Sequence, residues 1–223
     1  MMKFINSLLF IIIGLISVNI KAENSISPGR PGAANPMTAM PIGQFQFEVG
    51  YNFDLDSTTT HSAPYLFRTG VYQNLELQLG YNSGYSVTLL YEDVPIFKSL
   101  NTSILVSITP DQNNDKKIDT IDEINFSTID LYIPWSLNKF PISGQLAKVS
   151  NGIDFSFSTS ASIGKKIGVF VELFESDDFN IWADSGFTYL LQNNIQLDFS
   201  TGIQIDNLKN YFLEAGLSYR LPK

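Results

Sequence analysis

Cysteine is absent from the 223-residue chain, and histidine occurs only once. The absence of cysteine excludes disulfides, thiolate nucleophiles, cysteine-based zinc sites and acylation of a lipoprotein cysteine. A single histidine leaves little room for a histidine-dependent catalytic site or metal centre. Basic residues are also scarce, since 14 Lys and Arg face 22 Asp and Glu, and a net charge of -8 disfavours nucleic acid as a partner. We therefore expect no enzymatic activity and no cofactor.

Long apolar runs are missing too, with one exception near the N-terminus. Residues 8–16 are apolar apart from one glycine, with Lys3 before them and Ala22 after them. A charged start, a short apolar stretch and a small residue at the break are typical of a secretory signal peptide. The run is shorter than the ~20 residues that a membrane-spanning helix needs. We expect residues 1–22 to be a signal peptide that is cleaved after Ala22.

The rest of the chain is dominated by alternation with a period of two. In residues 44–53 every odd position is apolar and every even position is polar or glycine. Successive side chains of a strand point to opposite faces, so this segment predicts a strand with one apolar and one polar face. The same rule predicts strands at 44–54, 63–72, 74–82, 85–93, 101–109, 123–133, 140–149, 152–163, 166–175, 180–191, 194–205 and 211–221. Leu89-Leu90 and Thr128-Ile129 interrupt the alternation and predict bulges.

Most of these strands approach the length of about 9–11 residues that a tilted strand needs to cross a bilayer. A membrane-spanning sheet has to close, because unpaired strand edges cannot lie in hydrocarbon. We predict an all-β fold for residues 44–221, a transmembrane antiparallel up-and-down β-barrel of 12 strands in the outer membrane of a Gram-negative bacterium. A soluble β-sandwich or lipocalin-like cup is the alternative, and it would turn the apolar faces into a shared core.

The segment before the first predicted strand carries a family resemblance. Residues 28–48 resemble the opening of the outer-membrane transporters grouped as the meta-pathway phenol-degradation family, although Gly29 stands where those proteins usually have an acidic residue. The matching positions are Arg30, Pro31, Gly32, Pro36, Thr38, Pro41, Gly43, Gln46 and Glu48. The resemblance implies a barrel that carries small solutes, aromatic ones among them. Residues 214–221, within the last predicted strand, are similar to the signal that the barrel-assembly machinery recognises.

If the apolar faces meet lipid, the opposite faces line a lumen. The charged residues on those faces are Glu48, Arg68, Glu76, Glu92, Asp154, Glu172, Asp184, Asp198, Glu214 and Arg220. Rings of carboxylates attract cations, so one interpretation is a passive channel for a small-molecule solute. The alternative is a structural or surface-interaction barrel, in which arginines pair with carboxylates and fill the interior. The Pro-rich segment 23–43 would lie in the periplasm or enter the barrel as a partial plug against Arg68 or Glu48.

Residues 111–122 follow the oxygen spacing of a calcium-binding loop. The candidate ligands are Asp111, Asn113, Asp115, Asp119 and Asp122. Two positions depart from the pattern, because Lys116 replaces the glycine of the sharp turn and Asp122 replaces a bidentate glutamate. The segment is therefore interpreted either as a Ca²⁺ site on an outer loop or as a solvated acidic loop.

The single histidine, His61, lies in a run of serine and threonine in the first predicted outer loop. A barrel phospholipase would need a Ser–His pair with an orienting group, and a loop histidine among hydroxyls is more often solvated.

The partners that we expect are outer-membrane lipids, the barrel-assembly machinery and a small solute.

Overall fold

The computed structural model describes residues 26–30, 32–55, 60–82, 84–94, 100–110, 126–137, 140–149, 152–176 and 180–221. The predicted signal peptide and the predicted calcium loop at 111–122 lie outside these residues. Every regular element within them is a β-strand. None of the described residues belongs to a helix with the length and apolarity needed to span a bilayer.

Fourteen strands make up one sheet. They are β1 (Phe45–Leu55), β2 (Thr60–Ser62), β3 (Tyr65–Tyr72), β4 (Leu75–Tyr81), β5 (Tyr85–Tyr91), β6 (Leu100–Thr102), β7 (Ile104–Pro110), β8 (Phe126–Leu137), β9 (Ile142–Val149), β10 (Gly152–Ile163), β11 (Ile167–Ser176), β12 (Asn180–Gln192), β13 (Ile195–Gln204) and β14 (Tyr211–Arg220). β2 and β3 both pair with β1, and β6 and β7 both pair with β8. Each of these pairs forms one interrupted strand, so the wall has the twelve strands that the alternation predicted.

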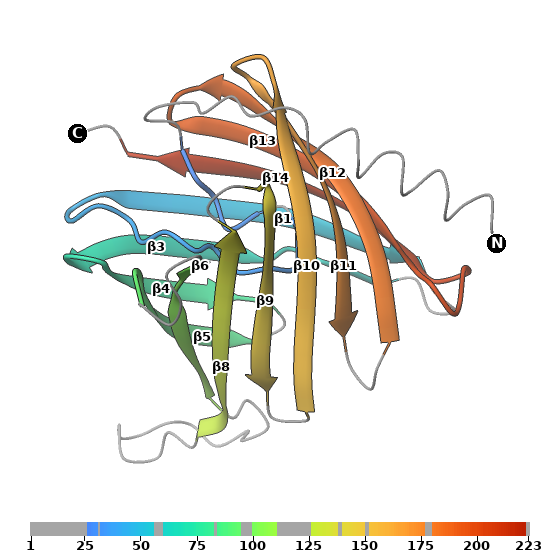
Figure 1. Ribbon diagram of the computed structural model, residues 1–223, viewed down its shortest axis with the longest axis horizontal. Helices are drawn as coiled ribbons and strands as arrows, with labels where there is room; N and C mark the ends of the chain where they lie inside the picture. Colours follow the sequence, from blue (N-terminus) through green and yellow to red (C-terminus); the bar gives the residue numbers. More distant parts are fainter. Residues whose placement is uncertain are drawn as a thin grey trace.

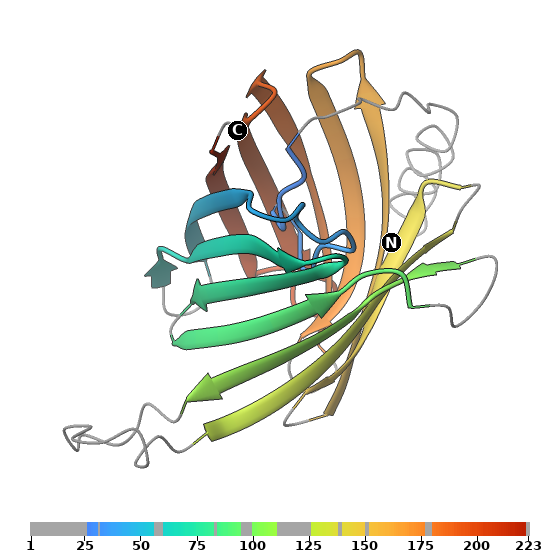
Figure 2. The ribbon, with the colours of Figure 1, turned by 90° about the vertical axis from the view of Figure 1, so that its left-hand side faces the viewer.

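The sheet closes on itself. The twelve strands of the wall pair antiparallel with their neighbours along the chain, and β1 pairs with β14 from Gln46–Arg220 to Leu55–Tyr211. The strands consequently surround a common interior (Figure 1 and Figure 2). This confirms the predicted all-β, antiparallel up-and-down barrel.

The two interruptions of the wall lie at proline residues. β8 extends to Leu137, beyond the predicted end at residue 133, and passes through Pro134. Proline has no backbone N–H and cannot complete a ladder, so the neighbouring strand breaks opposite it, at Ser103 between β6 and β7. The Ser103 N–H still donates to the Pro134 carbonyl over 3.1 Å. In the same way, the break between β2 and β3 contains Pro64, whose carbonyl accepts the Gly50 N–H over 2.8 Å.

The outer face of the wall is apolar and the inner face is polar. On β1 the side chain of Phe47 is 47% exposed, whereas those of Gln46 and Glu48 are fully buried. On β13 Leu197 and Phe199 are exposed, whereas Gln196, Asp198 and Ser200 are buried. A soluble β-sandwich or cup would show the reverse, with apolar side chains inside. The soluble alternative is therefore wrong, and the wall is that of a transmembrane barrel.

The bulge predicted at Leu89-Leu90 is wrong. The pairing of β5 with β7 runs without a shift through Leu89–Val106 and Leu90–Leu105. Leu90 and Leu105 are both fully buried on the inner face, so the alternation is intact and one inner position is simply apolar. Near the second predicted bulge, a shift does occur where Thr109 pairs with Thr128 and Pro110 pairs with Phe126.

Candidate functional site

The N-terminal segment of residues 26–30 and 32–43 runs inside the barrel, and we call it the plug. It begins at the turn between β12 and β13, where the Ile26 N–H donates to the Asn193 carbonyl over 2.9 Å. It ends against β3, where residue Ile42 bridges to Gly70 and the Gly43 N–H donates to the Gly70 carbonyl over 3.1 Å. Figure 2 shows this segment, in blue, within the space that the strands enclose.

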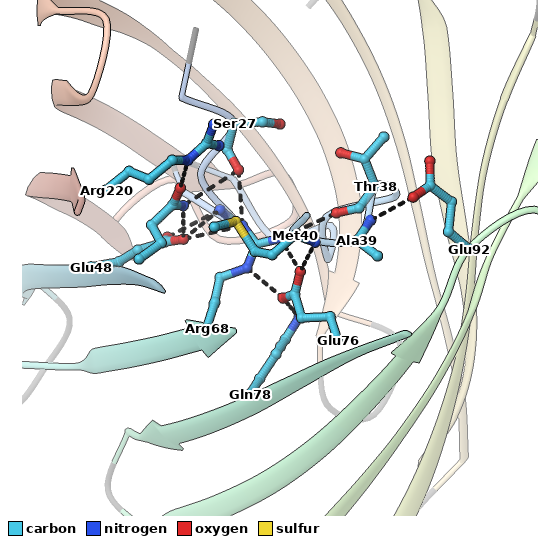
Figure 3. A network of polar contacts seen from close by, with 12 residues as sticks. Ser27, Thr38, Ala39, Met40, Glu48, Arg68, Glu76, Gln78, Glu92 and Arg220 are labelled. Carbon is cyan, nitrogen blue, oxygen red and sulfur yellow. Dashed lines mark hydrogen bonds and ion pairs between the residues drawn. The ribbon is translucent and has the colours of Figure 1, made fainter. Parts of the chain in front are cut away.

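Arg68 is the central anchor of the plug (Figure 3). Its guanidinium is 1% exposed and makes two hydrogen bonds to Glu76, of 2.6 and 3.0 Å, and one to Glu48, of 3.2 Å. It also donates to the plug carbonyls of Ser27 at 2.9 Å and Thr38 at 3.3 Å. Arginine can satisfy carboxylates and carbonyls together because its planar fork carries five donors. Two distant points of the plug are thereby tied to one side chain of the wall.

Wall carboxylates accept backbone N–H groups of the plug at four places. Glu48 accepts from Gly29 at 3.0 Å, and Glu76 accepts from Met40 at 2.6 Å. Glu92 accepts from Ala39 at 2.9 Å, and Glu172 accepts from Ala33 at 2.8 Å. Burial raises the pKa of the Glu92 carboxyl, and the Ala39 hydrogen bond partly offsets this. Hydrogen bonds to ionised groups are stronger than neutral ones, so these contacts hold the plug against the wall.

Amide side chains extend the same network. Gln145 on β9 accepts both the backbone N–H and the side-chain amide of Asn35, at 3.0 and 3.1 Å. On the opposite side, Arg220 donates to Gln46 at 3.1 Å, and Gln46 donates to Glu48 at 2.7 Å. The plug therefore follows the inner wall from β1 across β11 and β9 to β4 and β3.

Arg30 is the one described cation that the plug itself contributes. Its guanidinium lies 3.4 Å from Glu214 and 3.8 Å from Asp198, and it also donates to Asn52 at 3.3 Å. It packs against Gly50, whose missing side chain leaves room for the guanidinium. Arg30 thus neutralises part of the acidic wall formed by β13 and β14.

A cavity of about 670 Å³ lies between the plug and the wall from β8 to β13. The wall contributes both hydroxyl and apolar side chains to it. The hydroxyl side chains are those of Ser136, Ser143, Ser158, Ser160, Ser162 and Thr188, and the apolar ones are those of Pro134, Leu137, Phe140, Pro141, Ile142, Ala161, Val169 and Phe170. Ser143 and Ser158 share a hydrogen bond of 2.8 Å. Glu172 and Arg30 border the cavity but already have partners in the plug and the wall. The space beside the plug is therefore lined by apolar side chains and by neutral hydroxyl groups that both donate and accept hydrogen bonds.

The ten charged positions expected in the lumen fall into two groups. Glu48, Arg68, Glu76, Glu92 and Arg220 meet around the two ends of the plug. Glu172, Asp184, Asp198 and Glu214 lie together on β11 to β14, near Arg30. Asp154 stands apart on β10, where it is partly buried.

The network around the plug also includes residues other than the ten charged positions. Arg30, Gln46 and Gln145 were not among the expected site residues. The sequence did contain a signal for Gln46 and Gln145, because both lie on the polar faces of predicted strands. The plug binds the wall mostly through its own backbone N–H and C=O groups. Every residue has such groups, so the sequence does not reveal these contacts.

His61 lies on the outer face of the wall. It pairs in register with Phe53 and stacks on Tyr51, with ring centroids 6.2 Å apart. Among the described residues, no group of three or more His, Cys, Asp and Glu side chains could hold a metal ion.

The contact between Gly70 and the plug gives a stability prediction. A Cβ at this position would lie 2.2 Å from the Met40 carbonyl oxygen and 2.5 Å from that of Pro41, both of which are backbone atoms. Gly70→Ala should therefore push the end of the plug from β3 and lower the free energy of unfolding by about 1–3 kcal/mol. Gly152→Ala is the matched control, because a Cβ there meets nothing within 4 Å. Denaturant unfolding in detergent micelles would measure both, and equal stabilities would contradict the close contact.

No family model matches the chain, and no curated protein matches it by sequence. Solved structures do resemble it. The KdgM porin in complex with disordered oligogalacturonate is 12% identical, with a TM-score of 0.55 over 78% of this chain and 98% of that one. The NanC porin is 10% identical, with a TM-score of 0.53 over 78% of this chain and 100% of that one. An outer-membrane channel from Pseudomonas putida F1 is 10% identical, with a TM-score of 0.51 over 85% of this chain and 100% of that one.

At these identities the likeness concerns the fold. The chain shares a closed barrel with these porins and channels, and the resemblance of residues 28–48 to the meta-pathway family stays a prediction.

Proposed function

We propose that the protein is an outer-membrane channel of a Gram-negative bacterium that passes a small solute passively, without a cofactor or catalysis. The observation that carries this is the 670 Å³ cavity beside the plug, inside a closed barrel with an apolar exterior. A barrel of twelve strands is wider than the eight-stranded type, whose interior side chains fill it. Outer-membrane lipids surround the wall, and the barrel-assembly machinery inserts it.

In this proposal the ten charged inner residues have different tasks. Those around Arg68 hold the plug, and those on β11 to β14 face the solute, with Asp154. The hydroxyl groups and apolar side chains of β8 to β12 would line the passage, because the cavity lies between these strands and the plug. A small solute with an aromatic or other apolar part suits a lining in which apolar side chains alternate with hydroxyl groups.

The alternative is a barrel with a closed interior that serves structure or surface interaction. The observation in its favour is the dense network of Arg68, Glu48 and Glu76, which fills one side of the interior. Reconstitution into planar bilayers separates the two functions. We expect discrete conductance steps and, under a salt gradient, a reversal potential that favours cations, because acidic groups outnumber arginines on the inner face. A barrel without conductance would support the structural alternative.

A further inference from the structure

Three aromatic side chains on the inner face of the wall contact one another. Phe174 on β11 and Trp182 on β12 pair in register, and their rings stack with centroids 6.4 Å apart. Phe212 on β14 lies 5.7 Å from Trp182 and 6.5 Å from Phe174. All three are only partly buried, so they present ring surface to the interior. We call Phe174, Trp182 and Phe212 the aromatic platform.

Gly202 makes the platform possible. β13 lies between β12 and β14, and its residue between the rings is Gly202, which pairs with both Asp184 and Phe212. A Cβ at this position would lie 2.3 Å from the Phe212 ring. Because glycine has no side chain there, Phe212 can lie across β13 and reach Trp182. The platform thus spans four neighbouring strands.

Each aromatic residue of the platform has an acidic residue two positions away on its own strand. The pairs are Phe174 with Glu172, Trp182 with Asp184, and Phe212 with Glu214. Residues two apart share a face and lie about 7 Å apart along the strand. In every pair the aromatic residue is nearer the rim formed by Ser176, Asn180 and Tyr211. A row of rings therefore borders a row of carboxylates.

Asp184 is the acid in this row that lacks a compensating group. It is 6% exposed, and its Oδ1 has no hydrogen-bond partner among the described residues. Arg30 pairs with Glu214 and Asp198, and none of the ion pairs of the described residues includes Asp184. Its direct cross-strand partner is Glu172, a second buried acid. Like charges directly opposite each other destabilise a sheet, and a buried carboxylate without a partner is costly.

We infer that the platform and Asp184 form a binding site for a small organic cation, an amine or quaternary ammonium that carries an apolar group. Aromatic faces attract cations, and desolvated sites strengthen this attraction. The positive group of such a solute would supply the partner that Asp184 lacks, while its apolar part would cover the exposed rings. The inference rests on the proposed function in one respect, namely that a solute passes through the interior of the barrel.

Trp182 gives a direct readout of this site. The chain has two tryptophans, and the other, Trp135, contacts Phe157 and lies on the outer face of β8. Trp135→Phe therefore leaves Trp182 as the only fluorescent indole. In detergent micelles we would titrate this variant with benzylammonium, benzyl alcohol and benzoate, which share one ring and differ in charge. We expect a saturable change with benzylammonium, at least about tenfold weaker binding of benzyl alcohol, and none of benzoate.

Two further variants test the roles of the acid and the rings. Asp184→Asn should weaken the binding of benzylammonium about tenfold and leave that of benzyl alcohol unchanged. Phe212→Leu keeps apolar bulk but removes a ring, and should also weaken the binding of benzylammonium. Asp93→Asn is the control, because Asp93 is exposed just after β5.

The inference is overturned if benzyl alcohol binds as tightly as benzylammonium, or if Asp184→Asn behaves like Asp93→Asn. Binding in micelles does not require conductance. A barrel that binds benzylammonium but conducts no ions would contradict only the proposed channel function. A conducting barrel whose Trp182 fluorescence does not respond to benzylammonium would contradict only the cation-binding site.

Discussion

Arg68→Met is expected to lower the free energy of unfolding by about 3–5 kcal/mol, because removal of one partner leaves buried charges without compensation. Arg68 is 1% exposed, and both of its carboxylate partners, Glu48 and Glu76, are fully buried. The substitution would also remove the donors to the plug carbonyls of Ser27 and Thr38. Unfolding by guanidinium in detergent micelles, followed by tryptophan fluorescence, would measure the loss.

A second substitution shows whether the loss comes from the orphaned carboxylates. Glu76 makes the bidentate contact with Arg68, so Arg68→Met combined with Glu76→Gln should recover part of the stability. Lys148→Met serves as the surface control, because Lys148 is exposed at the end of β9 and contacts only backbone carbonyls. A loss below about 1 kcal/mol for Arg68→Met would mean that the plug N–H groups alone satisfy Glu48 and Glu76.

The wall could be predicted because lipid on one side and polar groups on the other impose a period of two on every strand. Phe45 to Phe53 shows this pattern on β1, and the observed register with β14 follows it without a shift. The predicted bulge at Leu89-Leu90 was wrong because Leu90 is an apolar residue at an inner position, and two adjacent leucines hide the alternation. It also missed the end of β8, because Pro134 normally argues against a strand.

The plug could not be derived in the same way. The described residues of this segment, 26–30 and 32–43, form no regular strand or helix, so their sequence has no period to read. Their partners on the wall bind backbone atoms of Gly29, Ala33 and Met40, and any residue other than proline could donate there.

The aromatic platform had a clearer signal in the sequence than the plug. Phe174, Trp182 and Phe212 are aromatic residues at positions that the alternation assigned to the polar face.

The plug also reduces the number of inner carboxylates that can attract a cationic solute. Carboxylates that accept plug N–H groups, such as Glu76 and Glu92, are no longer free to attract cations. The unpaired acid is on the opposite side, at Asp184, beside the platform. Charge selectivity should therefore arise on β11 to β14, and substitutions around Arg68 should change stability more than selectivity.

Removal of the plug is expected to have the largest effect on conductance. Replacement of residues 26–40 by a short Gly-Ser linker should raise the single-channel conductance about two- to fivefold, because the unplugged interior of a twelve-stranded barrel is wider. Arg68 would keep its ion pairs with Glu48 and Glu76, so the wall should still fold. Recordings in planar bilayers would compare the two proteins, and an unchanged conductance would contradict a passage beside the plug.

The absence of cysteine allows a matched control in which the plug is locked in place. The side chains of Asn35 and Gln145 are in hydrogen-bond contact, so a short, reducible bis-thiol crosslinker between Asn35→Cys and Gln145→Cys should tie the plug to the wall. Because the cavity lies beside the plug rather than beneath it, we expect the crosslinked and reduced forms to conduct equally. If crosslinking abolished the current and reduction restored it, the plug would have to leave the wall before the solute could pass. The conducting pathway would then be the space that the plug now fills.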